Sequence, residues 1–100
     1  MVAHLEETVA EQRFASARLE ELAGLLCAAG LYARVNLPIG RPPSLHVVNP
    51  AAPGLEEHVV IERRDRGEWW LRWSWAEEIA PAGELDRAVD TIRRVLGVSA

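Results

Sequence analysis

The sequence contains no lysine, because all eleven of its basic residues are arginine. A mechanism that needs a lysine Schiff base is therefore excluded. The single cysteine, Cys27, can form neither a disulfide within the chain nor a zinc site built on cysteine pairs. A basic excess is also lacking, since 15 acidic residues give a formal net charge of −4. Surfaces that bind nucleic acid are usually basic, so nucleic acid is not an expected partner.

Long apolar runs and the common catalytic motifs are missing as well. No apolar run approaches the ~18 residues of a membrane span. Met1–Glu11 has three acidic residues and no basic one, unlike a signal peptide. We therefore expect a cytoplasmic protein without membrane contact. The sequence has no glycine-rich phosphate loop, GxSxG elbow, dinucleotide fingerprint or HExxH. We accordingly expect no cofactor and no metal, and the sequence favours a non-enzymatic protein over an enzyme.

The chain of 100 residues, 49% of them apolar and 26% charged, has the size and composition of one globular domain. Its first segment, from about Ala3 to Ala29, has the apolar periodicity of a helix. The repeating positions are Val2, Leu5, Val9, Ser16, Leu19, Ala23 and Leu26, with Ala15, Leu22 and Leu25 widening the stripe. Such a helix reaches ~40 Å. Because short strands cannot cover that length, its first half is predicted to project, to bend, or to pack on another subunit.

Alternating residues then predict four strands, separated by turns rich in proline and glycine. The predicted strands are Leu31–Leu37, Ser44–Asn49, His58–Arg63 and Glu68–Trp75. Ala76–Ala80 is compatible with one helical turn or an irregular bridge. A final helix is predicted from Glu84 to Leu96, burying Leu85, Ala88, Val89, Ile92, Val95 and Leu96. The predicted fold class is α+β, with an antiparallel meander of four strands and both helices on one face of the sheet.

The last predicted strand carries all four tryptophans. Alternation places Trp69, Trp73 and Trp75 in the core with Leu71, and turns Trp70 and Arg72 to the opposite face. The residues predicted to share that second face, as a candidate interface or ligand surface, are Tyr32, Arg34, His46, Val48, Trp70 and Arg72. An exposed tryptophan beside an arginine is typical of a protein anchor, and also suits stacking on a planar ligand. Ordinary surface is the remaining alternative.

Several other residues have a structural and a chemical interpretation. His46 and His58 are predicted to meet across a hairpin, where Glu57 or Glu77 would complete a metal site, although structural or surface histidines are favoured. Cys27 is expected to be a buried, inert thiol. Glu77 and Glu78 are interpreted as partners of a helix dipole rather than as acid or base catalysts. The arginine-rich turn is expected to be a solvated hairpin tip; its basic residues are Arg63, Arg64 and Arg66.

The segment Gly67-Glu-Trp-Trp-Leu-Arg-Trp-Ser-Trp-Ala-Glu-Glu-Ile-Ala-Pro81 resembles a group of short, uncharacterised proteins from GC-rich bacteria. The likeness extends to Val47-Val48-Asn49-Pro50 and to a helix at each end of the chain. The group is similar to regulatory or accessory proteins in size and build, and the order of helix, strands and helix is similar to that of small secretion-chaperone-like dimers. This resemblance implies a fold and no particular activity.

The leading hypothesis is a non-enzymatic interaction module with a regulatory or chaperone-like accessory role, acting as a homodimer, with a further protein as a candidate partner. The alternative is a small-molecule binder or small enzyme with a pocket between helix and sheet, lined by Trp70, Arg72, His46 and Glu77. Binding of nucleic acid through the arginine-rich turn is a third hypothesis, which the net charge disfavours.

Overall fold

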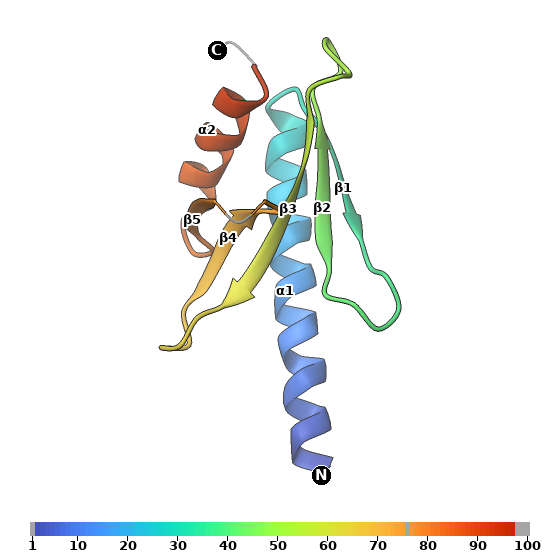
Figure 1. The fold of residues 1–100 in the computed structure, drawn as a ribbon, viewed down its shortest axis with the longest axis vertical. Helices are drawn as coiled ribbons and strands as arrows, with labels where there is room; N and C mark the ends of the chain where they lie inside the picture. The colour runs from blue at the N-terminus through green and yellow to red at the C-terminus, as the bar shows by residue number, and fades with distance from the viewer. Residues whose placement is uncertain (1, 76, 98–100) are drawn as a thin grey trace.

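The computed structural model describes the backbone of residues 2–75 and 77–97, and the side chains of this range from Val9 onward. Two helices flank an antiparallel sheet, and both lie behind it in Figure 1. The elements are α1 (Val2–Ala28), β1 (Tyr32–Asn36), β2 (Ser44–Val48), β3 (Glu56–Arg63), β4 (Trp69–Trp73), β5 (Glu78–Pro81) and α2 (Leu85–Val95). The predicted fold class is confirmed, except that the sheet has five strands instead of four. Neither described helix has the length and apolar character that crossing a membrane requires.

The C-terminal half of α1 packs on the sheet, and its N-terminal half runs on past the sheet's lower edge (Figure 1). The predicted apolar stripe is buried from the middle of the helix onward, at Ala15, Leu19, Leu22, Ala23 and Leu26. Val9 is 45% exposed and Leu25 is 40% exposed, so the predicted burial of Leu25 was wrong. Within the single chain the first half of α1 projects beyond the sheet, and packing on another subunit stays a prediction.

A Schellman motif ends α1 and directs the chain into β1. The amide of Leu31 donates to the carbonyl of Leu26, and the amide of Gly30 donates to the carbonyl of Cys27. Gly30 has a φ of 94°, a backbone region that a side chain disfavours. Leu31 and Leu26 are both buried, as the hydrophobic contact of this motif requires. The turn therefore fixes how α1 crosses the sheet.

The sheet is a meander in the order β1-β2-β3-β4-β5, with every neighbouring pair antiparallel. Alternate residues of the central strands form the core beneath α1. These are Leu45, Val47, Val59, Ile61 and Leu71. α1 contacts β1, β2 and β3, whereas α2 contacts β5 and α1. One face of the sheet is thus covered by helices, and the other faces the viewer in Figure 1.

The burial of the tryptophans agrees with the prediction except at Trp75. Trp73 is buried, and Trp69 packs partly buried against the core. Trp75 is 50% exposed, which corrects its assignment to the core. β4 ends at Trp73, and Trp75 lies in the turn that follows. Alternation stops being a guide to burial where the strand stops.

The segment after the tryptophans forms β5, and neither a helical turn nor an irregular bridge. Ala80 pairs with Leu71 and Pro81 with Trp70, while Ile79 and Ala80 are buried under α2. Ala76, the first residue of the predicted turn, lies outside the described residues. α2 buries Ala88 and Ile92 as expected, but Val95 is 46% exposed, contrary to prediction.

Asn49, just after β2, is a buried polar residue that links the end of this strand to the C-terminal end of α2. Its side-chain nitrogen donates to the carbonyl of Leu96 over 2.8 Å, and its side-chain oxygen accepts the amide of Ala51. Its backbone amide donates to Leu55. Because buried polar groups are costly without partners, this pattern explains an asparagine at this position.

Candidate functional site

The uncovered face of the sheet brings together the six residues that alternation assigned to it. On β1 and β2, Tyr32 lies opposite Val48, and Arg34 lies opposite His46. On β4, Trp70 and Arg72 point to the same face, two strands away from His46. We call this surface the open face; its members are Tyr32, Arg34, His46, Val48, Glu56, His58, Val60, Glu62, Trp70 and Arg72.

Four members of the open face come from β3 and were not among the predicted site residues. They are Glu56, His58, Val60 and Glu62, which separate the β1–β2 group from the β4 pair. Alternation within the predicted strand already gives His58, Val60 and Glu62, and Glu56 follows when the alternation starts two residues earlier. With them, the open face carries two acidic and two basic side chains around its aromatic ones.

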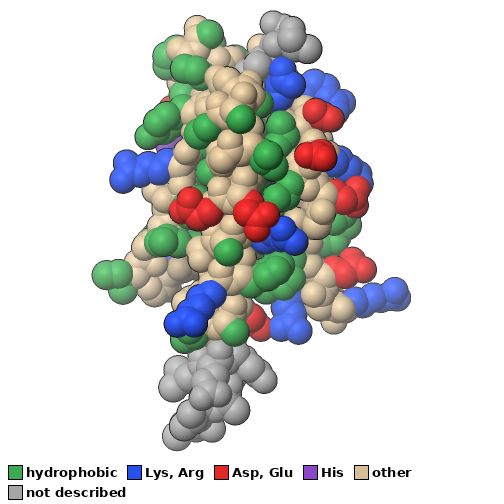
Figure 2. Space-filling view, turned by 180° about the vertical axis from the view of Figure 1, so that it is seen from behind, with side chains coloured by type: hydrophobic (Ala, Val, Ile, Leu, Met, Phe, Trp, Pro, Cys, Tyr) green, Lys and Arg blue, Asp and Glu red, His purple; other side chains and the backbone are tan. Residues whose placement is uncertain are grey.

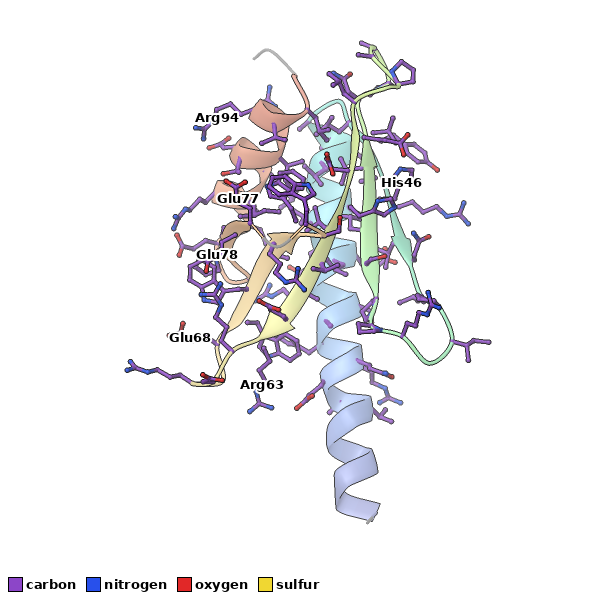
Figure 3. The ribbon with its side chains drawn as sticks, viewed as in Figure 1. His46, Arg63, Glu68, Glu77, Glu78 and Arg94 are labelled. Carbon is purple, nitrogen blue, oxygen red and sulfur yellow. The ribbon has the colours of Figure 1, made fainter. Side chains whose placement is uncertain are left out.

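His46 and His58 do meet across the hairpin, as the sequence predicted. Their rings stack with centroids 4.6 Å apart and an interplanar angle of 10°. The Nε2 atom of His46 lies 3.2 Å from the carboxylate of Glu56. Glu57 lies opposite the buried Val47 and so points to the helix side, and Glu77 lies on the β5 side of the sheet (Figure 3). Within the described residues, no three acidic, histidine or cysteine side chains are placed to hold a metal ion.

Trp70 and Arg72 are both half-buried, and each is held by other side chains of the chain. The guanidinium carbon of Arg64 lies 4.3 Å from the ring centroid of Trp70, which is a cation–π contact. Arg64 also pairs with Glu78. The Nε atom of Arg72 donates to Glu62 over 2.9 Å. These contacts fix the orientation of the pair before any partner binds.

The β3–β4 turn is exposed to solvent, as the sequence predicted, but two of its three arginines also pair with acidic side chains. Arg63 donates to Glu11 of α1 over 2.6 Å, and Figure 3 shows it at the lower end of β3, beside that helix. Arg64 is engaged with Trp70 and Glu78, as described above. Arg66 is exposed at the tip of the turn. Two of the three arginines are therefore paired within the chain and do not form a free basic patch.

Cys27 differs from its prediction, because it is exposed and not buried. Its sulfur lies 3.8 Å from the backbone oxygen of Ala33 on the edge strand β1. No acidic or histidine side chain among the described residues forms a hydrogen bond with it. The thiol is best described as a weak contact between the end of α1 and the sheet edge.

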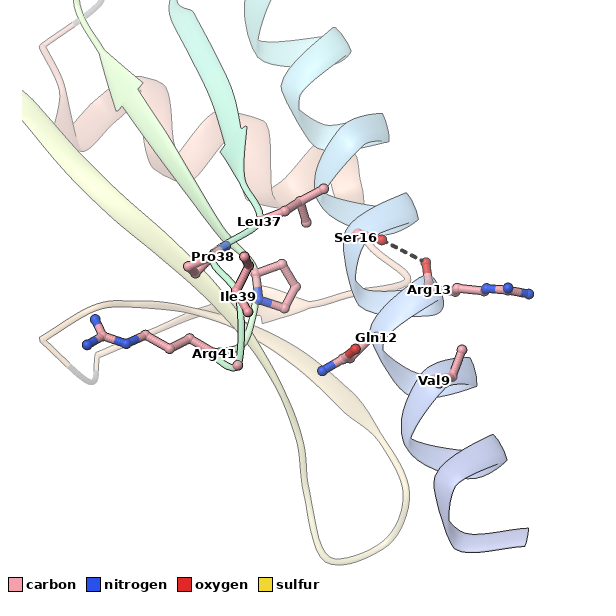
Figure 4. A pocket seen from close by; sticks show the side chains of 10 residues that line it. Val9, Gln12, Arg13, Ser16, Leu37, Pro38, Ile39 and Arg41 are labelled. Atoms are coloured by element: carbon pink, nitrogen blue, oxygen red, sulfur yellow. Dashed lines mark hydrogen bonds between the residues drawn. The ribbon is translucent and has the colours of Figure 1, made fainter. Parts of the chain in front are cut away.

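Two grooves flank α1 where it leaves the sheet. One, about 340 Å³ in volume, lies between α1 and the β1–β2 loop (Figure 4). The other lies between α1 and the lower end of β3, where Trp69 and Ile61 form its floor and Phe14 stacks on Trp69 at 5.1 Å. Viewed from the helix side, hydrophobic side chains reach the surface on both flanks of α1 (Figure 2). None of the residues expected to line a pocket between helix and sheet lines either groove.

The chain matches no protein-family model, no curated protein and no solved structure. The function of the open face and of the grooves is therefore argued from their geometry.

Proposed function

We propose that this protein is a small non-enzymatic interaction module that acts as a homodimer in the cytoplasm, with a regulatory or chaperone-like accessory role. The observation that carries the proposal is the helix α1, which continues beyond the sheet and leaves apolar surface on both of its flanks. A chain of this size buries a limited share of its surface on folding. Dimerisation would bury the rest of this apolar surface.

The exposed apolar side chains near the projecting helix support this proposal. Ile39 is 101% exposed at the tip of the β1–β2 loop, and Leu37 is 65% exposed beside it. On α1, Val9 and Phe14 are 45% and 39% exposed. A single exposed hydrophobic residue needs no explanation, but several exposed apolar side chains on both flanks of one helix are typical of an interface.

The open face is the surface that we assign to a further protein partner. It offers Tyr32, which is 52% exposed, and the half-buried Trp70 with its fixed arginines. Tryptophan, tyrosine and arginine are enriched at the positions that dominate binding energy in protein interfaces, and tyrosine and tryptophan bury large areas at a low cost in side-chain entropy. A prearranged Trp70 would also lose little conformational freedom on binding.

Light scattering coupled to size-exclusion chromatography tests the homodimer. We expect the mass of two chains at micromolar concentration and a shift toward one chain on dilution. A strictly monomeric, folded protein at high concentration would refute it. For the open face, a variant with Trp70→Ala and Tyr32→Ala should keep the dimer mass and lose capture of the partner from a cell extract. Loss of the dimer in that variant would assign the open face to dimerisation instead.

A further inference from the structure

The groove between α1 and the β1–β2 loop, which we call the loop groove, has apolar walls and an arginine on each rim. α1 contributes Val9, Gln12, Arg13 and Ser16, and the loop contributes residues 37–41 together with Pro43 (Figure 4). Leu37 and Ile39 are the most exposed large hydrophobic residues in the described chain. An occupant with an apolar stripe would cover both of them.

The two charged lining residues, Arg13 and Arg41, lie on opposite rims of the loop groove, and their side chains extend away from it (Figure 4). Both are exposed, and neither forms an ion pair with another described residue. Arg13 has no acidic residue three or four positions away along α1, the spacing at which helical side chains pair. Among the described residues that line the groove, none is acidic. The loop groove therefore favours an occupant that is both apolar and acidic.

The sequence at the start of α1 has that composition. Residues 2–11 contain Glu6, Glu7 and Glu11 and no arginine. They also carry Val2, Leu5 and Val9 at steps of three and four, which gives one apolar stripe on a helix. Glu11 pairs with Arg63 of its own chain, so the proposed contact uses the charges of Glu6 and Glu7.

We propose that the loop groove binds the first turns of α1 from a second copy of this chain, so that the two helices lie antiparallel. The inference rests on the homodimer proposed above and specifies its interface. When Val9 of one helix faces Ala10 of the other, Glu6 falls opposite Arg13 in an antiparallel pair. In this arrangement the apolar stripe of one copy, which includes Leu5, would face Ile39 and Leu37 of the other copy. A two-fold axis makes this contact twice, and the assembly closes as a dimer.

Two charge-reversal variants test this interface against each other. The first carries Glu6→Arg and Glu7→Arg, and the second carries Arg13→Glu and Arg41→Glu. Each alone places like charges across both copies of the contact, so we expect dimerisation to weaken by about tenfold or more. Mixed in equal amounts, the two variants restore opposite charges at both contacts, and we expect a heterodimer with the affinity of the unaltered protein. Native mass spectrometry distinguishes it from either homodimer.

The matched control carries Arg66→Glu and Arg94→Glu, two exposed arginines away from the groove. It has the same charge change as the second variant and should dimerise normally. Circular dichroism and the midpoint of thermal unfolding of each variant verify that the fold is intact. Ile39→Asp provides a second test of the groove, because Ile39 is fully exposed in one chain and its replacement should weaken only the dimer.

The outcomes separate this inference from the homodimer on which it rests. If the unaltered protein is a dimer and both variants dimerise like it, the homodimer stands and the loop groove is not its interface. Weakened variants that fail to form a heterodimer when mixed would equally refute the antiparallel pairing. If the unaltered protein is a monomer, the homodimer itself is refuted, and the groove proposal with it.

Discussion

The indole rings of Trp73 and Trp75 are parallel, with centroids 5.8 Å apart and an interplanar angle of 2°, yet their burial is opposite. Trp73 is 2% exposed and Trp75 is 50% exposed. The Nε1 atom of Trp75 donates to Glu57 over 3.0 Å and so keeps its ring over Trp73. Trp75 therefore packs on the outer side of the buried Trp73 and is not itself a core residue.

This division predicts unequal losses of stability. Trp73→Ala should lower the free energy of unfolding by about 3–5 kcal/mol, because it leaves a cavity in the core. Trp75→Ala should cost about 1 kcal/mol, since its ring is half-exposed and loses a stacking contact of roughly that size. Urea unfolding followed by circular dichroism measures both. Equal losses would mean that Trp75 is buried as deeply as Trp73.

Asn49 should be among the most sensitive polar positions. Asn49→Ala removes the hydrogen bond to the carbonyl of Leu96 and leaves that acceptor unpaired near the C-terminal end of α2. We expect a loss of about 1–3 kcal/mol in unfolding free energy. Asn36→Ala is the control, because Asn36 is exposed at the end of β1 and should change stability by less than about 0.5 kcal/mol. A similar effect at both positions would contradict this role of Asn49.

Two glycines of the α1 region should respond to alanine with opposite signs. Gly24 lies in the helix with no atom within 4 Å of an added Cβ, so Gly24→Ala should stabilise the protein by about 0.5–1 kcal/mol. Gly30 has a φ of 94°, so Gly30→Ala should destabilise it by about 1–2 kcal/mol. Thermal unfolding of both variants provides the comparison. Two changes of the same sign would show that the end of α1 differs from the Schellman motif described.

The ion pair between Arg72 and Glu62 should contribute little to stability. Their side chains are 27% and 41% exposed, and pairs in such surroundings are worth about 0.2–1 kcal/mol. A double-mutant cycle with Arg72→Ala and Glu62→Ala measures the coupling directly. A coupling well above 1 kcal/mol would mean that the pair is structural, and that Arg72 cannot be altered to probe binding on the open face.

Much of the fold followed from periodicity, because local patterns determine where helices and strands form. The steps of three and four in α1 and the alternation around Leu45, Val59 and Leu71 correctly separated the covered face from the open face. Alternation also placed Trp70 and His46 on one surface. These assignments needed no knowledge of distant contacts.

The errors occurred where distant contacts decide the structure. β5 is short and lacks a clear pattern, and its pairing with β4 and packing under α2 are not encoded in its own residues. Trp75 lies beyond the end of its strand, a boundary set by the turn that leads into β5. The engagement of Arg64 with Trp70 and Glu78 likewise joins two strands and could not be read from one segment.

The mass of the unaltered protein in solution, measured by sedimentation equilibrium over a range of concentrations, tests the central proposal most directly. The exposed apolar flanks of α1 and the acidic and basic halves of its proposed contact predict a reversible equilibrium between one and two chains. Because the contact includes charge pairs, added salt should weaken it. A folded protein that keeps the mass of a single chain at every concentration would contradict the account.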